Sequence, residues 1–298
     1  MCKSTLFAQA WVMVAKSESM KVTLACAFFL LPDKQYNTYS LVLNKIKELG
    51  VSNPEVFHLD FEAATVKAVK NMFPNTVIEC CDTNWKCCLR EHQKELGLIP
   101  HINLNVDIQN FCRKLWALSY VPQKDVVDVY TKVILPTMPE VDADNSGDEL
   151  DDVNNYTESL DQYLTYFEAT WIGAVNKRTQ VRGKPKFSMN LWVKYEAVKE
   201  GREDLTSNRS KAWNSANKIS IPMKPNIWVV CKAIKAEEGL ARAKLHAAMG
   251  GNPPSDPNPG RTKKRVDRAK ALKKIVDQYG ILTINTYLDA LVSHFNDA

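Results

Sequence analysis

The sequence predicts an α/β protein in which a mixed sheet forms first and helices make up most of the remaining chain. Three observations predict this class. Two apolar runs, residues 6–15 and 22–31, flank a polar stretch, a short strand–helix–strand pattern occupies residues 56–78, and helical periodicity begins after Asn84. At 298 residues, the chain is long enough for one large or two ordinary domains.

The first predicted element is a β-hairpin. Residues 6–15 and 22–31 are expected to pair as antiparallel neighbours because only the polar residues 16–21 separate them, and Pro32 ends the second strand. A helix is predicted next, with Gly50 as its C-terminal stop. Its apolar side chains recur at helical spacing at Tyr36, Tyr39, Leu43 and Ile46.

The stretch from residue 56 to residue 62 ends an apolar run in a carboxylate, Asp60. A helix comes next, and residues 76–78 return as a second short strand. One side of this helix is predicted to bury Phe61, Thr65, Ala68, Val69 and Met72. Ligands and metals bind at the carboxyl ends of strands in open α/β sheets, but an acid there is also a common helix N-cap. Asp60 is therefore either a cap or a functional ligand.

After Asn84 the sequence predicts helices that end at Gly97, near Pro122 and at Pro136. Further helices are predicted around residues 160–171, 192–198, 206–219, 227–245, 261–274 and 284–295. Residues 139–155 are acidic and poor in aromatic side chains, which predicts a mobile loop. The run Asp142-x-Asp144-x-Ser146-Gly147 resembles a calcium loop only superficially, because it lacks the helical flank.

The composition is that of a soluble globular protein, with 45% hydrophobic and 24% charged residues. No apolar run approaches the roughly 20 residues that span a bilayer, and the first residues lack the layout of a signal peptide. We therefore expect an intracellular protein, nuclear or cytoplasmic, that is not secreted and has no membrane partner. In such a reducing compartment the eight cysteines are not expected to form a disulfide framework.

Charge is distributed unevenly along the chain. Residues 140–176 carry ten acidic and no basic side chains, whereas residues 177–298 carry 24 basic and 11 acidic ones. This asymmetry predicts a surface for a phosphate backbone, although lysine-rich helices are often only solvated faces. The candidate DNA-binding residues are Arg178, Arg182 and Lys184 in a basic turn and Arg261, Lys263, Lys264, Arg265 and Arg268 in a basic helix.

Six short motifs succeed one another along the chain. They are Leu30-Leu31-Pro32-Asp33-Lys34, Asp60-Phe61-Glu62-Ala63-Ala64, Phe73-Pro74-Asn75, Glu95-Leu96-Gly97-Leu98, Pro225-Asn226-Ile227-Trp228 and Arg265-Val266-Asp267-Arg268. Their order and spacing across nearly the whole chain resemble Mutator-like (MULE) DDE transposases, especially the animal transposon-derived branch.

This resemblance implies an RNase H-like core with a helical insertion before its last catalytic acid. The family holds two divalent metals, magnesium or manganese, on an Asp-Asp-Glu triad and uses them for DNA hydrolysis and strand transfer. Asp60 corresponds to the second acid of that triad and would be a magnesium ligand.

The sequence departs from the family at the other special positions. The first triad Asp normally lies on the opening strand, just before the segment that matches residues 6–9, so this chain lacks it and most of that strand. Asn208 and Trp213 set a register in which Lys211 occupies the position of the triad Glu. An ammonium group there would repel a metal ion. Cys81 is the remnant of the family's Cys-x-x-His, with Asn84 in place of the His.

The neighbouring cysteines allow two interpretations. A zinc centre is one, but the adjacent pairs formed by Cys80, Cys81, Cys87 and Cys88 lack the usual C-x2-C spacing. Buried free thiols are the other, and the spacing favours them.

The predicted layout is an RNase H-like core at 1–98, a helical insertion at 99–200 with its acidic loop, a last core helix at 201–221 and a basic helical extension at 222–298. The predicted function is that of a transposase-derived, DNA-binding protein without cleavage activity. The alternative is a domesticated, non-enzymatic DNA-binding or protein-interaction module. A third hypothesis, an ordinary metal-dependent nuclease, needs another acid near Asp60, and Glu62 and Asp82 are the nearby candidates. Whether the chain forms a homodimer stays open.

Overall fold

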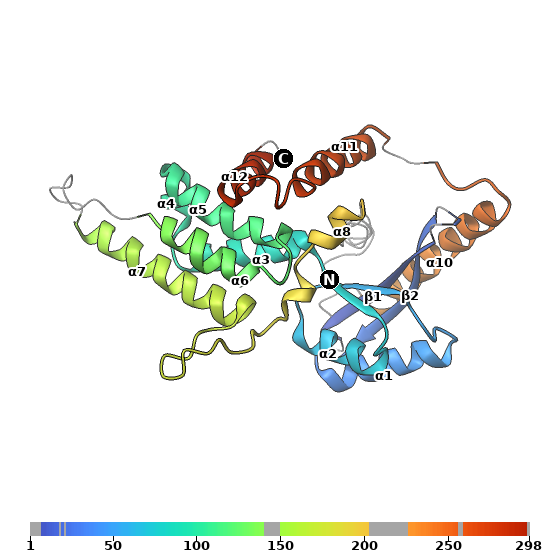
Figure 1. The fold of residues 1–298 in the computed structure, drawn as a ribbon. Coiled ribbons are helices and arrows are strands. Elements are labelled where there is room, and N and C mark those ends of the chain that lie inside the picture. The colour runs from blue at the N-terminus through green and yellow to red at the C-terminus, as the bar shows by residue number, and fades with distance from the viewer. Residues whose placement is uncertain are drawn as a thin grey trace. The chain divides into compact units, whose positions relative to one another are not determined.

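The computed structural model describes residues 7–17, 19–20, 22–139, 150–202, 226–255 and 259–296. It is a mixed α/β protein, mostly helical, with two small sheets (Figure 1), so the predicted α/β class is confirmed at this level. The chain divides into two compact units, each built from separated stretches of sequence. Residues 1–78 and 206–259 form the strand-bearing unit, and residues 79–205 and 260–298 form the helical unit.

The strand-bearing unit begins with the predicted hairpin. Its elements are β1 (Gln9–Ser17), β2 (Val22–Leu31), α1 (Tyr36–Glu48), β3 (Val56–Leu59), α2 (Ala63–Met72), the start of β4 (Val77–Cys80) and α10 (Ile227–Met249). β1 and β2 pair antiparallel from Gln9 opposite Leu31 to Ser17 opposite Val22, with a bulge between Met13 and Val14. The antiparallel pairing predicted from the two apolar runs is therefore confirmed.

A second pair of strands consists of β3 and β4. The connection between them contains α2, which is the kind of crossover that joins parallel strands. Within the described part of the chain, these two pairs share no strand.

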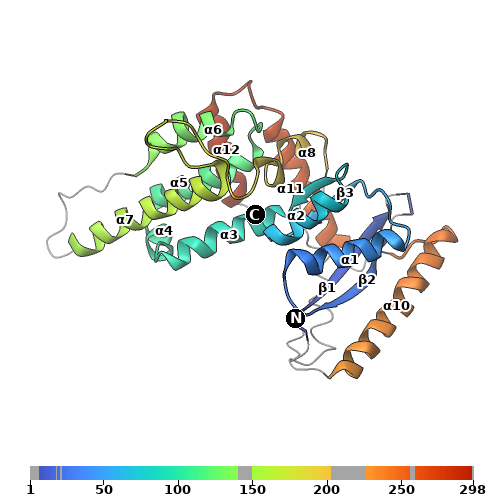
Figure 2. The same ribbon diagram turned by 90° about the horizontal axis from the view of Figure 1, so that it is seen from below.

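Helices cover the hairpin on two sides. Tyr39, Leu43 and Ile46 of α1 are buried, as their spacing predicts, and the Trp11 ring of β1 lies 5.7 Å from the Tyr39 ring. α10 packs against β2, and the hairpin lies between α1 and α10 (Figure 2). This layering is why an isolated pair of strands, marginal on its own, is stable in this unit.

The helical unit is built from short helices and irregular turns. Its elements are α3 (Asp82–Glu95), α4 (Ile99–Leu104), α5 (Val106–Ala117), η1 (Leu118–Tyr120), α6 (Val126–Val129), η2 (Tyr130–Ile134), η3 (Leu135–Thr137), α7 (Leu150–Phe167), η5 (Glu168–Ile172), η6 (Met189–Leu191), α8 (Tyr195–Lys199), α11 (Pro259–Val276) and α12 (Ile284–Asn296). α12 packs on α5, and α7 packs on α3.

An aromatic cluster forms part of the core of this unit. Trp85 of α3 is fully buried and stacks on Trp192, with ring centroids 4.7 Å apart and planes 8° from parallel. Trp171 meets the Trp85 ring edge-on at 6.1 Å. Large rings supply much of the buried apolar area in such a core.

The structure corrects the end of the predicted acidic loop. The composition of residues 139–155 predicts a loop throughout, but α7 begins at Leu150. Carboxylates are favoured in the first turn of a helix, so an acidic composition does not prevent helix formation there. Residues 140–149, with the run that resembles a calcium loop, lie outside the described residues.

Two further differences concern the helices. The helix predicted to stop at Pro136 continues as a π-helical and then a 3-10 segment to Thr137, with Pro136 tolerated near the start of that last turn. The predicted extension 222–298 is divided, since α10 belongs to the strand-bearing unit and α11 and α12 to the helical unit. The helix predicted at 206–219 lies outside the described residues.

No helix in the described part of the chain is long and apolar enough to cross a membrane.

Candidate functional site

Asp60 follows β3 directly, at the carboxyl end of that strand. It is exposed, and its carbonyl oxygen accepts a hydrogen bond from the Glu62 amide at 2.8 Å. The N-cap of α2 is Glu62, and Glu62 makes no side-chain capping bond. The interpretation of Asp60 as the helix cap is therefore wrong, because the turn delays the helix by two residues.

The Glu62 carboxylate is held by hydroxyl donors from two helices. The Tyr39 hydroxyl donates to Glu62 Oε2 at 3.0 Å, and the Thr65 hydroxyl donates to the same oxygen at 3.4 Å. Gln9 of β1, which is buried, in turn donates its side-chain amide to the Tyr39 hydroxyl. Burial raises the pKa of Tyr39 first of all, and the Glu62 carboxylate raises it further, so the phenol stays a donor.

Two carboxylates lie in the segment that joins β3 to α2, those of Asp60 and Glu62. The Glu62 carboxylate accepts two hydrogen bonds, from Tyr39 and Thr65. Residues 7–139, 150–202, 226–255 and 259–296, where described, contain no group of three or more acidic, His or Cys side chains placed to hold a metal ion. Lys211, which occupies the position of the third acid in the family, lies outside the described residues.

Asp82 is not available as a further ligand. It is only 7% exposed and forms an ion pair with Lys86 at 2.9 Å. The Tyr120 hydroxyl donates to the same carboxylate oxygen, Oδ2, at 3.0 Å. Burial alone would lower the pKa of Lys86, but Asp82 and Tyr120 together outweigh it and raise that pKa. Asp82 is therefore a neutralised structural charge of the helical unit.

Glu79, near the end of β4, belongs to a second buried cluster. Its carboxylate accepts a hydrogen bond from the Arg202 guanidinium, and the Lys194 ammonium lies 3.9 Å from Oε2. The Lys194 side chain is 1% exposed and also donates to the Leu191 carbonyl oxygen at 3.3 Å. Burial lowers the pKa of Lys194, and Glu79 opposes this shift. Sequence reasoning missed this buried lysine, and the only local signal is that its neighbours Trp192 and Tyr195 are aromatic.

Cys81 is buried and is the N-cap residue of α3. Cys80 beside it is buried too, Cys87 is exposed and Cys88 is half-buried. The seven cysteines in the described ranges are all reduced thiols. This scatter between core and surface does not resemble a shared tetrahedral site.

The predicted basic turn is an ordered hairpin loop, residues 174–186, in which Val175 and Arg182 form a β-bridge. Asn176 closes the tip, since its side-chain oxygen accepts from the amides of Arg178 and Thr179 at 2.9 and 3.1 Å. At the base, Gly173 has φ +88°, and a Cβ there would lie 1.9 Å from the Gly183 carbonyl oxygen. Only glycine allows this close approach.

The cationic side chains of this loop have two different roles. Arg178 and Lys184 are exposed, together with Lys177 and Lys186. Arg182, which is among the predicted DNA-binding residues, is 17% exposed and turned inward. Its guanidinium donates to the Gly173 carbonyl oxygen and lies 3.4 Å from Glu168. Arg182 therefore holds the base of the loop.

The second basic surface is α11. Lys263, Lys264, Arg265 and Arg268 are all exposed on it, while Leu272 and Val276 are buried. Arg261 belongs to this helix, but its side chain lies outside the described set. α11 and the hairpin loop 174–186 lie far apart within the helical unit (Figure 1), so they are two separate basic surfaces.

Comparison with known proteins adds no family. No protein-family model matches the chain, and no curated protein is significantly similar to it in sequence.

Proposed function

We propose that this chain is a DNA-binding protein derived from Mutator-like DDE transposases, and that it does not itself cut or join DNA. The observation that carries the proposal is the position of Asp60, an exposed acid at the carboxyl end of β3 that follows a hairpin and a helix in the order the family has. The exposed cations on the hairpin loop and on α11 support DNA as the partner.

The arrangement of the strands supports an RNase H-like core. The hairpin β1–β2 precedes α1 and the strand–helix–strand unit β3–α2–β4 in the chain, which is the element order that the resemblance implies. In the described part of the chain, the two pairs of strands share no member. Helices α1 and α10 cover the hairpin on two sides, as helices do in an α/β layer architecture.

The donor set supports the absence of cleavage. Metal-dependent strand transfer needs carboxylates that converge on the ions. Glu62 is engaged by Tyr39 and Thr65, and Asp82 is neutralised by Lys86 in the helical unit. An ordinary nuclease built on Asp60 and Asp82 is not supported for the same reason.

DNA binding is tested by fluorescence anisotropy with a labelled duplex at several salt concentrations. We expect a steep loss of affinity with salt, because cations that neutralise phosphates release bound counterions. Arg178→Glu/Lys184→Glu is expected to weaken binding at least tenfold and to reduce the salt slope. The matched control is Lys94→Glu/Lys124→Glu, which makes the same charge change at exposed positions of the same unit. Equal losses in both double variants would show a non-specific charge effect.

Catalysis is tested with supercoiled plasmid and with pre-cut DNA ends, in magnesium and in manganese. We expect neither nicking nor joining. Activity that disappears in Asp60→Ala would overturn the inactive part of the proposal and leave the DNA-binding part standing.

The hairpin loop also favours a second function, a non-enzymatic interaction module unrelated to transposition. Its hydrogen-bonded tip and exposed cations fit any polyanionic partner. Binding to duplex DNA that stays weaker than millimolar at low salt, or that does not change with salt, would leave protein interaction as the better assignment.

A further inference from the structure

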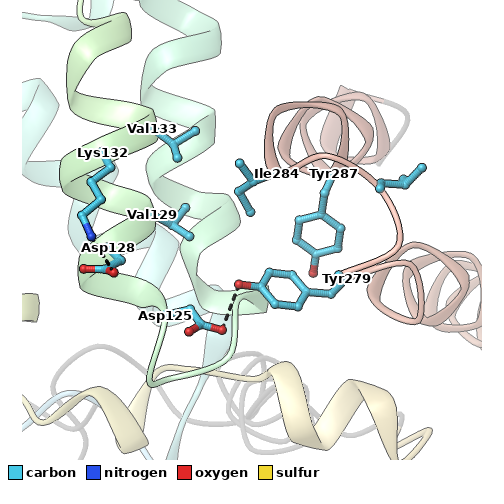
Figure 3. A pocket seen from close by; sticks show the side chains of 10 residues that line it. Asp125, Asp128, Val129, Lys132, Val133, Tyr279, Ile284 and Tyr287 are labelled. Carbon is cyan, nitrogen blue, oxygen red and sulfur yellow. Dashed lines mark hydrogen bonds and ion pairs between the residues drawn. The ribbon is translucent and has the colours of Figure 1, made fainter.

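The helical unit contains a cavity of about 320 Å³ whose lining includes none of the exposed cations of the hairpin loop 174–186 or of α11. It lies between the helical segment 125–133 and the turn that connects α11 to α12 (Figure 3). A cavity of this size falls within the range of small-molecule sites, at the lower end.

The walls of the cavity are mostly apolar. Val129 and Val133 line one side and face Ile284 on the other (Figure 3). Two aromatic side chains, Tyr279 and Tyr287, complete the second side, with their rings edge to face at 5.1 Å. The Tyr287 hydroxyl donates to the Tyr120 carbonyl oxygen, which fixes this ring from behind.

One wall carries a negative charge that is fixed in place. Asp125 Oδ2 accepts a hydrogen bond from the Tyr279 hydroxyl at 3.0 Å. Burial raises the pKa of Tyr279, and the Asp125 carboxylate raises it further, so the phenol remains a donor to that carboxylate. A second acid, Asp128, is paired with Lys132 at 2.8 Å. Lys132 is the one cationic side chain among the lining residues, so the lining keeps one net negative charge.

The rim gives a further reason to expect a ligand. Ile281 is 74% exposed and Leu282 is 37% exposed, and both lie in the turn that borders the cavity. Exposed apolar side chains that adjoin a cavity are more informative than scattered ones. A phosphate or other anion does not fit, because Asp125 would repel it.

We propose that this cavity binds a small organic cation, an ammonium group carried on an apolar body. The apolar walls would take the body, and the tyrosine rings and Asp125 would take the charge, since an ammonium group is attracted both to a carboxylate and to the electron-rich face of a ring. None of the cations proposed to bind DNA lines this site, and the inference does not depend on the proposed function.

The first experiment measures binding of two probes of the same shape by ligand-observed NMR and calorimetry. Benzyltrimethylammonium carries the charge, and neopentylbenzene is its neutral counterpart. We expect the cation to bind at least tenfold more tightly. Equal affinity, or no binding of either probe, would overturn the proposal without any need for a variant.

The second experiment locates the charge. In Asp125→Asn, which keeps an oxygen for the Tyr279 hydroxyl, we expect the preference for the cation to disappear while the neutral probe binds as before. Asp161→Asn, an exposed acid on α7 in the same unit, is the matched control and should keep the preference. Loss of the preference in both variants, or in neither, would contradict the assignment to Asp125.

The third arm distinguishes a free compound from a protein side chain. Nα-acetyl-trimethyllysine amide carries the same cationic head on a peptide-like body. We expect it to bind more weakly than benzyltrimethylammonium. Tighter binding would instead identify the cavity as a site for a modified lysine, and the small-molecule proposal would be wrong.

Discussion

Two sets of carboxylates that are close in sequence have opposite surroundings. Asp60 and Glu62 follow β3 in the strand-bearing unit, where Asp60 is exposed and Glu62 is held by neutral hydroxyl donors. Glu79 of β4 and Asp82, the first residue of α3, are buried in the helical unit and paired with cations. Closeness in sequence therefore does not make these acids interchangeable as metal ligands.

This comparison indicates which of the acids contribute to the stability of the folded protein. A buried carboxylate must be compensated by charge and hydrogen bonds, since an isolated ion in the interior is very costly. An exposed acid makes no such demand, because water solvates its charge. Under the proposed function, Asp60 is the acid of these two sets that we expect to have a functional role.

The largest effect is expected for Glu79→Ala. Removing this acid leaves the Lys194 ammonium buried without its carboxylate, so we expect the free energy of unfolding to fall by about 3–5 kcal/mol in urea titrations. The control is Glu91→Ala, an exposed acid of α3, which should stay within about 0.5 kcal/mol of the parent protein. A small loss of unfolding free energy in Glu79→Ala would mean that the buried cluster of Glu79, Lys194 and Arg202 contributes little to stability.

A smaller effect is expected for Tyr39→Phe. The substitution keeps the buried ring and removes the hydroxyl between Gln9 and Glu62, which leaves a buried amide without this partner. We expect a loss of about 1–3 kcal/mol. Tyr36→Phe removes a hydroxyl whose hydrogen bond to Asn71 is exposed, and it should cost less. Equal losses would show that the link to Glu62 has no special weight.

Lys194→Met is expected to change the free energy of unfolding only modestly near neutral pH. Its larger effect is expected on how that free energy changes with pH. Arg202 still pairs with Glu79 in this variant, and methionine can fill the apolar space. Because burial lowers the pKa of Lys194, the unfolded chain binds more protons above that lowered value. The parent protein should therefore gain stability, relative to Lys194→Met, as pH rises toward the ordinary lysine pKa of 10.5. If the free energies of unfolding of the two proteins changed in parallel over this alkaline range, a lowered pKa of Lys194 would be contradicted.

The smallest effect on stability is expected for Asp60→Ala. An exposed acid outside a helix cap should change the free energy of unfolding by no more than about 0.5 kcal/mol. Asp82→Ala, measured beside it, should cost several-fold more because the half-buried Lys86 ammonium loses its carboxylate partner. A strong destabilisation by Asp60→Ala would remove the main structural reason to regard it as functional.

Local patterns were sufficient for much of the strand-bearing unit. The hairpin follows from two apolar runs and a polar turn, and α1 buries the side chains that its spacing selects, Tyr39, Leu43 and Ile46. The strand–helix–strand order around Asp60 also follows from sequence. Such features depend on neighbours in the chain, which periodicity detects.

Features that depend on distant residues were not predictable. The spacing of cations in the basic turn carries no sign that Arg182 turns inward to Gly173 and Glu168 while Arg178 stays exposed. The burial of Lys194 depends on Glu79, more than a hundred positions earlier in the chain. The cavity likewise brings Asp125 to Tyr279. None of these contacts leaves a periodic signal.

The packing of α10 on β2 has a consequence for how the chain is made. β2 ends at Leu31, whereas α10 starts at Ile227, so the hairpin cannot gain this cover until most of the polypeptide has been synthesised. The helical unit is also incomplete at that stage, since α11 and α12 come later still. Domains usually fold as the ribosome releases them, from the N-terminus onward. Here neither unit is complete before the segments after residue 226 have been made, and a chain released before that point would leave the side of the hairpin that α10 covers exposed to solvent.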